Sequence, residues 1–174
     1  MKKRILGYAI VAILGILSAL VVSSIFQPSW VQGSSMYPTV KDQSLVLMNK
    51  VAYLLEEPKV GDIVVFKSHI YTDSGEGKLL IKRVIGVEGD RISITDGKVY
   101  RNSKVVEESY VNSTERHDNM EEITVEKGKI FVMGDNRNSS LDSRDVVVGQ
   151  VDKTTILGKV DVRLLPIKDI GTIQ

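Results

Sequence analysis

The stretch ILGYAIVAILGILSALVVSSIF, Ile5 to Phe26, contains no charged side chain and separates a short basic start from everything that follows. As a helix, its 22 residues would extend about 33 Å, enough to cross a hydrocarbon core of about 30 Å. The basic residues KKR precede the stretch, and the next charge downstream is Lys41. The positive-inside rule therefore predicts three parts: a cytoplasmic N-terminus (1–4), a transmembrane anchor (5–26) and an extracytoplasmic domain (27–174).

A cleaved secretory signal is the alternative interpretation of the same stretch. Val22 and Ser24 loosely fit a small-residue cleavage pattern. However, the apolar core of such a signal is usually only about 7–15 residues long. Trp30 also lies just past the end of the stretch. This is the position of the membrane–water boundary, which an indole side chain favours. The length of the run favours a retained anchor.

The overall composition excludes several classes of protein. The chain has 174 residues, 43% of them hydrophobic, and a net charge of +1. This balance gives no electrostatic reason to expect a nucleic-acid partner. Because the chain has no cysteine, it has no disulfide, no thiolate metal site and no cysteine nucleophile.

After the apolar stretch, the sequence consists of short alternating or apolar runs separated by turn residues, a pattern typical of β-strands. No amphipathic helix of convincing length is indicated there. We therefore expect a mainly β, antiparallel domain. The predicted strands are LVLMNKVAYLL (45–55), DIVVF (62–66), LLIKRVIGV (79–87), RISIT with KVYRN (91–102), KIFVMG (129–134) and ILGKVDVRLLPI (156–167).

Two further features concern the middle of the chain. The pair Asp96-Gly97 lies between RISIT and KVYRN and predicts a hairpin turn of the primed type. The segment 102–126 is more polar and more acidic than its surroundings. It is either a small second lobe or a long excursion, and the sequence leaves both possibilities open.

The loop QGSSMYPTV, Gln32 to Val40, carries two adjacent serines just beyond the apolar stretch. A serine hydroxyl is a weak nucleophile and requires a base to accept its proton. The usual base is histidine, but His69 and His117 both lie in polar stretches typical of solvated loops. Nothing in the sequence indicates a Ser-His-Asp triad, although the sequence does not exclude one.

Lysine is the remaining base of suitable strength, provided that its ammonium form is destabilised by burial. Lys82 lies in LLIKRVIGV among leucine, isoleucine and valine, with Arg83 as the one other polar residue. On a strand, the two cations point to opposite faces, so one of them shares a face with Leu80 and Val84. Composition alone leaves open an edge-strand lysine whose amine reaches solvent.

Four motifs follow the anchor in a fixed order: GSSMYPT, KVGDIVVF, IKRVIGVEGD and MGDNRNSSLDSRDVVVG. Together they closely resemble the type I signal peptidases of bacteria, the Ser/Lys endopeptidases that remove signal peptides from exported proteins. The short chain and single anchor are similar to the Gram-positive type, which has a small second lobe. The resemblance extends over nearly the whole chain.

The resemblance implies that Ser35, and not Ser34, is the nucleophile, and that Lys82 is its general base. In the family, the oxyanion is held by the backbone N–H of the nucleophile, here Ser35. Some members add a serine hydroxyl two residues earlier, where this chain has Gly33. A backbone group at this position or a water molecule would have to replace that donor.

The stretch GDNRNSSLDSR supplies the surroundings of the dyad by the same resemblance. Ser140 would form a hydrogen bond with the lysine amine and orient it. Asp142 and Arg144 would stabilise this part of the site. Asp135 is the expected ion partner of Arg83.

The expected substrate is a preprotein bearing a signal peptide, held at the surface of a phospholipid membrane. Leu79, Leu80 and Ile81 would pair with its backbone as an open strand edge. Met36 and Val40, which flank the nucleophile, are the expected walls of shallow pockets for small side chains. No metal or cofactor is expected, and the oligomeric state does not follow from the sequence.

Several rival interpretations use the same residues. A self-cleaving repressor-type protease shares a Ser/Lys dyad, but this chain has an anchor where a DNA-binding domain would stand. A membrane-tethered β module without catalysis, or a relative that binds signal peptides uncut, would make the dyad replaceable. A calcium loop in DNRNSS is excluded because Arg137 occupies a ligand position. The glycosylation-type matches at Asn112 and Asn138 carry no weight in a bacterial context.

Overall fold

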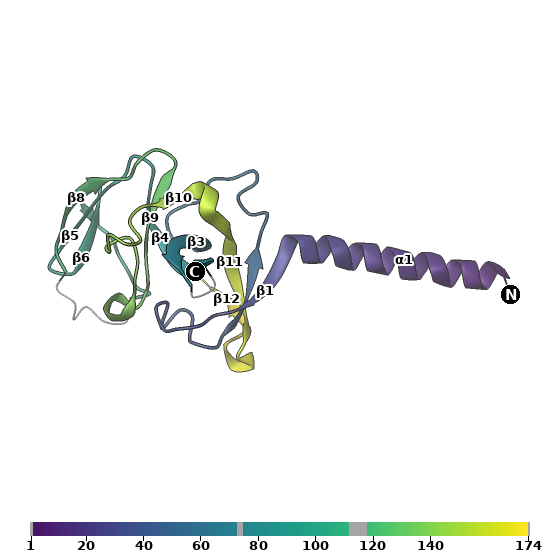
Figure 1. Ribbon diagram of the computed structural model, residues 1–174. Helices are drawn as coiled ribbons and strands as arrows, with labels where there is room; N and C mark the ends of the chain where they lie inside the picture. Colours follow the sequence, from purple (N-terminus) through teal and green to yellow (C-terminus); the bar gives the residue numbers. More distant parts are fainter. Residues whose placement is uncertain (1, 73–74, 112–117, 174) are drawn as a thin grey trace.

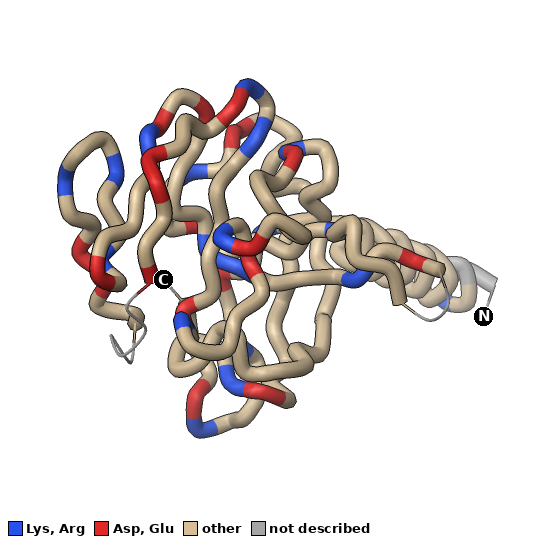
Figure 2. The backbone as a smooth tube through the Cα atoms, turned by 60° about the vertical axis from the view of Figure 1, so that its left-hand side comes forward, with Lys and Arg blue, Asp and Glu red and all other residues tan. Residues whose placement is uncertain are grey.

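A computed structural model describes residues 2–72, 75–111 and 118–173 of the chain. One long helix projects from a β domain of two sheets (Figure 1). Basic and acidic residues alternate along the backbone of that domain, with no long stretch of one sign (Figure 2). The elements are α1 (Lys2–Ile25), β1 (Phe26–Trp30), β2 (Leu45–Asn49), β3 (Ile63–Tyr71), β4 (Gly77–Val87), β5 (Arg91–Thr95), β6 (Lys98–Arg101), β7 (Lys104–Val105), β8 (Met120–Thr124), β9 (Lys129–Met133), β10 (Val151–Asp152), β11 (Ile156–Leu165) and β12 (Gly171–Thr172), with short 3-10 turns at Arg137–Ser139, Lys153–Thr155 and Ile167–Asp169.

Helix α1 corresponds to the predicted anchor. Its section Gly7–Ile25 has a mean hydropathy of 2.4, and none of the residues in that apolar window is buried within the protein. Among the described residues it is the one helix long and apolar enough to span a membrane. The helix ends one residue earlier than predicted, because Phe26 already belongs to β1 and pairs with Asn49. The chain therefore passes from the helix directly into the sheet.

The larger sheet has eight antiparallel strands in the order β1-β2-β11-β3-β4-β9-β10, with β12 beside β11. The strands β2, β3, β4, β9 and β11 follow the predicted runs, with one correction, whereas β1, β10 and β12 were not predicted. The run predicted as a strand over 45–55 ends at Asn49, whose side chain accepts a hydrogen bond from the Val51 N–H and turns the chain. The described residues contain no α-helix after α1.

Each face of the larger sheet has its own buried cluster, as the alternation of side chains requires. Val64, Phe66 and Val84 pack together on one face. On the opposite face, Met48 and Ile63 pack with residues of the loop between β1 and β2. This loop covers only part of its face of the sheet.

The smaller sheet has four strands in the order β7-β6-β5-β8. Asp96 and Gly97 form its first turn with φ values of 50° and 75°, as predicted for the hairpin. Its side chains share a core with β4 and β9, in which Ile92 packs with Ile85 and Phe131. This second lobe begins at Arg91, because RISIT and KVYR pair with each other, and it also takes in β7 and β8 from the segment 102–126.

Candidate active site

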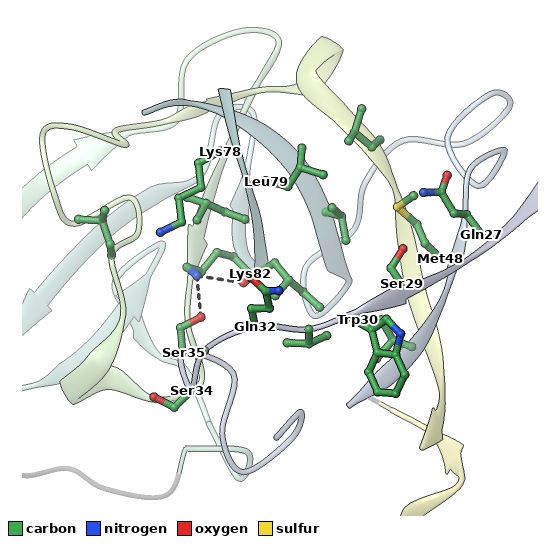
Figure 3. A pocket seen from close by; sticks show the side chains of 18 of the residues that line it. Gln27, Ser29, Trp30, Gln32, Ser34, Ser35, Met48, Lys78, Leu79 and Lys82 are labelled. Carbon is green, nitrogen blue, oxygen red and sulfur yellow. Dashed lines mark hydrogen bonds between the residues drawn. The ribbon is translucent and has the colours of Figure 1, made fainter. Parts of the chain in front are cut away.

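Ser35 and Lys82 meet where the loop after β1 crosses the middle of β4. The Lys82 Nζ donates a hydrogen bond to the Ser35 Oγ at 2.8 Å and another to the Ile81 carbonyl at 3.0 Å (Figure 3). Lys82 is only 2% exposed, whereas Ser35 is half-buried beside a cleft. Within the described chain, no carboxylate forms an ion pair with the lysine amine.

The electrostatics of Lys82 follow from this burial. Desolvation disfavours the ammonium form and lowers the pKa of Lys82 from 10.5 to about 8. The charge of Asp142 opposes this shift, and the nearby charge of Lys78 adds to it. A substantial fraction of the amine is therefore neutral in mildly alkaline solution, as a general base requires.

The backbone around Ser35 is held by the loop after β9. The Asn136 N–H donates to the Ser35 carbonyl at 3.0 Å, and the Asn136 side-chain amide donates to the Ser34 carbonyl at 3.1 Å. Gly134 permits this approach, because a Cβ at Gly134 would lie 2.5 Å from the Ser35 carbonyl oxygen. Gly134 and Asn136 both lie in the motif MGDNRNSSLDSRDVVVG, but no role was predicted for either of them.

The prediction that Gly33 contributes a backbone oxyanion donor is wrong for this structure. The Gly33 N–H donates to the Asp42 carboxylate at 2.7 Å and is therefore already engaged. Gly33 has a φ of 96°, a conformation that favours glycine over serine. Among the described residues, the Ser35 N–H has no hydrogen-bond partner, so one backbone donor remains beside the nucleophile.

The prediction for Ser140 also requires correction. Its buried hydroxyl has no hydrogen-bond partner in the part of the chain described, so the expected bond to the Lys82 amine is absent. A Cβ added at Gly134 would lie 2.3 Å from the Ser140 Oγ. Ser140 therefore packs against the glycine of its own loop.

Asp142 and Arg144 form an ion pair next to the dyad loop, in agreement with the role expected for them. The Arg144 Nε and Nη2 donate to the two Asp142 oxygens at 2.8 and 2.9 Å, and the Gly134 N–H donates to the same carboxylate at 2.9 Å. Arg144 also reaches Asp118 at 2.6 Å. These contacts fix the loop that holds the Ser35 backbone.

Arg83, the neighbour of Lys82, forms the predicted ion pair with Asp135. Its Nε and Nη2 donate to the Asp135 oxygens at 2.8 and 2.7 Å, and both side chains are almost fully buried. Its guanidinium carbon lies 4.0 Å from the centre of the Tyr110 ring. Thr39 donates to the same carboxylate at 2.5 Å, which ties the loop carrying Ser35 to this pair.

A third arginine pair joins the second lobe to the site. Arg137 donates to the two oxygens of Glu108 at 2.7 and 2.5 Å, and both side chains are largely buried. The Tyr110 hydroxyl donates to the same carboxylate at 2.9 Å. Sequence patterns do not indicate this pair, because its partners are separated by 29 residues and Glu108 lies in a generally acidic segment.

A cleft of about 770 Å³ extends from the dyad across one face of the larger sheet. The predicted substrate residues Leu79, Leu80 and Ile81 line it. Met36 and Val40 do not, because both are fully buried in the core beneath the loop, so their prediction as pocket walls is wrong. The other lining residues are Gln27, Ser29, Trp30, Val31, Gln32, Gly33, Ser34, Ser35, Val46, Met48, Lys50, Val65, Thr72, Lys78, Lys82, Ser139, Leu141 and Leu157.

The structure tests only one of the two histidines as an alternative base. His69 lies exposed on β3 and does not line the cleft, and His117 and Asn112 lie outside the described residues. The described residues also contain no cluster of histidine, aspartate and glutamate side chains able to hold a metal ion.

Comparison with known proteins shows which family the chain is similar to. Residues 3–165 match the family model described as signal peptidase, peptidase S26. The chain is 34% identical over 187 residues to signal peptidase IB of Staphylococcus aureus (strain COL), an alignment that covers 97% of this chain and 94% of that protein. It is 36% identical over 155 residues to the chloroplastic thylakoidal processing peptidase 1 of Arabidopsis thaliana, covering 86% of this chain but only 45% of that longer protein.

A solved structure shows a similar arrangement of the chain. The crystal structure of a signal peptidase I from Enterococcus faecalis superposes with a TM-score of 0.50 at 27% sequence identity. The superposition covers 60% of this chain and 97% of the other.

Proposed function

This chain belongs to the signal peptidase family, peptidase S26, and we propose that it is a membrane-anchored endopeptidase that removes signal peptides from exported preproteins. The observation that carries the proposal is the 2.8 Å hydrogen bond between the Lys82 Nζ and the Ser35 Oγ. It joins a nucleophile at the cleft to a base whose charge is destabilised by burial.

The proposed mechanism uses this pair twice. Neutral Lys82 accepts the Ser35 proton while the Ser35 oxygen attacks the scissile carbonyl, and the resulting ammonium protonates the departing amine. The acyl-enzyme then reacts with a water molecule whose proton passes to Lys82. As the ester bond to the Ser35 oxygen breaks, the Lys82 ammonium returns this proton to that oxygen, which regenerates the Ser35 hydroxyl and leaves Lys82 neutral.

The Ser35 N–H is the proposed oxyanion donor, since it has no other partner among the described residues. Because the Gly33 N–H is engaged by Asp42, a water molecule or a substrate-induced change would have to supply a second donor. Loss of one such donor costs about 2.7–4 kcal/mol in a well-studied serine protease, so a replacement is expected.

The proposed substrate strand lies along the first half of β4. Strand β9 pairs with β4 only from Arg83 to Val87, so on that side Leu79, Leu80 and Ile81 have no strand partner in the described chain. A substrate segment can add there as an extra strand next to the dyad. Its alternate side chains would then enter the cleft.

The proposed topology follows from the charges around α1. The residues KKR at its start would remain in the cytoplasm, and the β domain would lie outside the cell membrane. Because Ser35 follows the end of α1 by ten residues, the cleft stays near the outer membrane surface. Enzyme and signal peptide in one membrane meet at a raised effective concentration.

The other site residues are proposed to position the dyad. Asp135 links Arg83 on β4 to the loop that carries Ser35, and Asp142 with Arg144 fixes the loop whose Asn136 holds the Ser35 backbone. None of these four residues contacts the reacting hydroxyl.

Cleavage of a precursor carrying a signal peptide by the full chain in detergent tests the proposal. Ser35→Ala and Lys82→Ala should each abolish the product, while His69→Ala and His117→Ala should retain wild-type rates. Product formation by Lys82→Ala would overturn the assignment of the base. If the wild-type chain instead binds the precursor tightly without cutting it, the chain is a binding module.

A further inference from the structure

The second lobe takes no part in the proposed proton transfers. Its strands β5, β6 and β8 lie on the side of the β domain away from α1 (Figure 1), and none of its described residues lines the cleft. Between β7 and β8, however, three of its side chains contact arginines of the site. We call these three residues, Glu108, Tyr110 and Asp118, the lobe contacts.

Glu108 makes the most complete of these contacts. Its carboxylate accepts hydrogen bonds from the Nη1 and Nη2 atoms of Arg137 at 2.7 and 2.5 Å, and from the Tyr110 hydroxyl at 2.9 Å. A bidentate pair of this kind fixes the orientation of the guanidinium as well as its charge. The Nε of Arg137 also donates to the Gly134 carbonyl at 3.2 Å. Glu108 therefore holds the loop after β9 through Arg137.

The other two lobe contacts bind two further arginines. Arg144, which is paired with Asp142 in the catalytic core, also donates to Asp118 at 2.6 Å. Arg83 lies over the ring of Tyr110, with 4.0 Å from its guanidinium carbon to the ring centre, a favourable cation–π arrangement. Each of these arginines thus has a partner in the lobe as well as one in the catalytic core.

The loop that Glu108 holds is also the loop that fixes the nucleophile. Arg137 directly follows Asn136, whose N–H donates to the Ser35 carbonyl at 3.0 Å. A misplacement of about 1 Å at a reacting group can cost about 10²-fold in rate. The lobe is therefore connected to a part of the site where small displacements matter.

We propose that the lobe contacts are positioning residues, through which the second lobe holds the Ser35 backbone in the geometry that Lys82 requires. The expected effect on cleavage rests on the proposed function, whereas the expected effect on the loop does not. Because the lobe contacts do not line the cleft, their loss should lower kcat and leave KM nearly unchanged.

Glu108→Gln tests this inference, because it keeps the shape of the side chain and removes the charge that Arg137 binds. With the full chain in detergent and a signal-bearing precursor, we expect kcat to fall roughly tenfold. The pH of half-maximal activity should not move, since Glu108 is not among the main influences on the pKa of Lys82. Glu107→Gln is the matched control: Glu107 is the exposed neighbour in the same segment, and its variant should keep the wild-type kcat.

A double-mutant cycle tests whether Glu108 acts through its partner. Arg137→Gln should lower kcat as well, and the double variant should be no slower than the slower single variant. Independent effects would instead multiply.

Amide hydrogen exchange of the full chain gives a measurement that needs no cleavage. In Glu108→Gln, the Asn136 N–H should exchange faster than in the wild-type chain, whereas the amides of β3 should keep their wild-type rates. A general loss of stability would accelerate both, and Glu107→Gln should accelerate neither.

Two milder variants keep the test decisive if Glu108→Gln folds poorly. Asp118→Asn changes a carboxylate that is 23% exposed, and Tyr110→Phe removes only the hydroxyl that donates to Glu108. Each should lower kcat less than Glu108→Gln and accelerate exchange at Asn136.

The outcomes separate this inference from the proposed function. If the wild-type chain does not cleave the precursor, the proposed function fails, and the exchange rates alone decide whether the lobe holds the loop. If the folded variants at the lobe contacts keep the wild-type kcat and the wild-type exchange at Asn136, the lobe contacts do not position the dyad and the proposed function stands. An equal loss of kcat in Glu107→Gln would also overturn the inference, because the charge of the segment and not its contacts would then be responsible.

Discussion

Lys82 and Arg83 are adjacent cations on β4, both only 2% exposed, and they have entirely different surroundings. Arg83 is bound by both oxygens of Asp135 and lies against the ring of Tyr110. Among the residues that the structure describes, Lys82 has only the hydroxyl of Ser35 and the carbonyl of Ile81 as hydrogen-bond partners. One strand thus carries a paired cation and, beside it, an unpaired one.

This difference gives the two cations different roles: Arg83 stabilises the structure, whereas Lys82 is able to transfer a proton. A buried guanidinium on a carboxylate keeps its charge, and its planar fork fixes two segments of chain in one geometry. A buried ammonium without a carboxylate contact loses its proton more easily, which is why the pKa of Lys82 falls to about 8. Arg83, Arg137 and Arg144 hold the site together through ion pairs, whereas Lys82 is free to exchange a proton.

The largest effect is expected from Lys82→Arg. A guanidinium stays charged at any pH at which the protein is folded, so it cannot accept the Ser35 proton. The cleavage rate should fall by about 10³-fold or more, which single-turnover assays of a signal-bearing precursor would measure. A variant that keeps more than a tenth of wild-type activity would show that deprotonation of Lys82 is not required.

Arg83→Met should have the next largest effect, on stability. It leaves the carboxylate of Asp135 buried without its cation. Breaking a buried pair in this way costs about 3–5 kcal/mol, so the denaturation midpoint should fall sharply. Arg83→Met with Asp135→Leu serves as the control, because removing both charges should recover much of the loss. A midpoint unchanged in Arg83→Met would contradict the paired state.

Lys82→Met should act in the opposite direction. Because the pKa of Lys82 is lower in the folded chain, the unfolded chain binds its proton more tightly between pH 8 and 10.5, and wild-type stability rises with pH across that range. At pH 7 the methionine variant should be more stable, by as much as about 3 kcal/mol. Denaturant titrations at several pH values should show this gain shrinking above pH 8. Destabilisation at pH 7 would mean that burial of the ammonium carries no such penalty.

The smallest effect is expected from Asp142→Asn. The negative charge of Asp142 holds the pKa of Lys82 up, so its removal should lower that pKa further. The rise of kcat/KM with pH should then occur at lower pH than in the wild-type chain. Glu108→Gln removes a carboxylate that is not among the main influences on the pKa of Lys82, and it serves as the control. A shift to higher pH would reverse the assigned sign.

The strand pattern and the ordered motifs of the sequence predicted much of this arrangement. The pattern of LLIKRVIGV predicted β4, and Asp96-Gly97 predicted the hairpin turn between β5 and β6. The resemblance to signal peptidases predicted that Ser35 contacts Lys82 and that Arg83 contacts Asp135. Both contacts are present in the structure, although the partners lie far apart in the chain.

The wrong predictions have two physical causes. Some depend on contacts between segments that are distant in sequence, and others depend on the direction of the backbone, which the pattern of side chains does not encode. Met36 and Val40 flank the nucleophile, but their loop folds back and buries them against the larger sheet. The engagement of the Gly33 N–H depends on where Asp42 lies after that fold-back. The pair of Arg137 with Glu108 depends on the second lobe, which local periodicity does not place.

The pH dependence of kcat/KM for the full chain most directly tests whether neutral Lys82 is the base. Activity should rise with pH and reach half its maximum near the pKa of about 8, with no such rise in Lys82→Ala. A midpoint near the ordinary histidine pKa of about 6.5, or activity still rising beyond about pH 10, would contradict a buried lysine as the base.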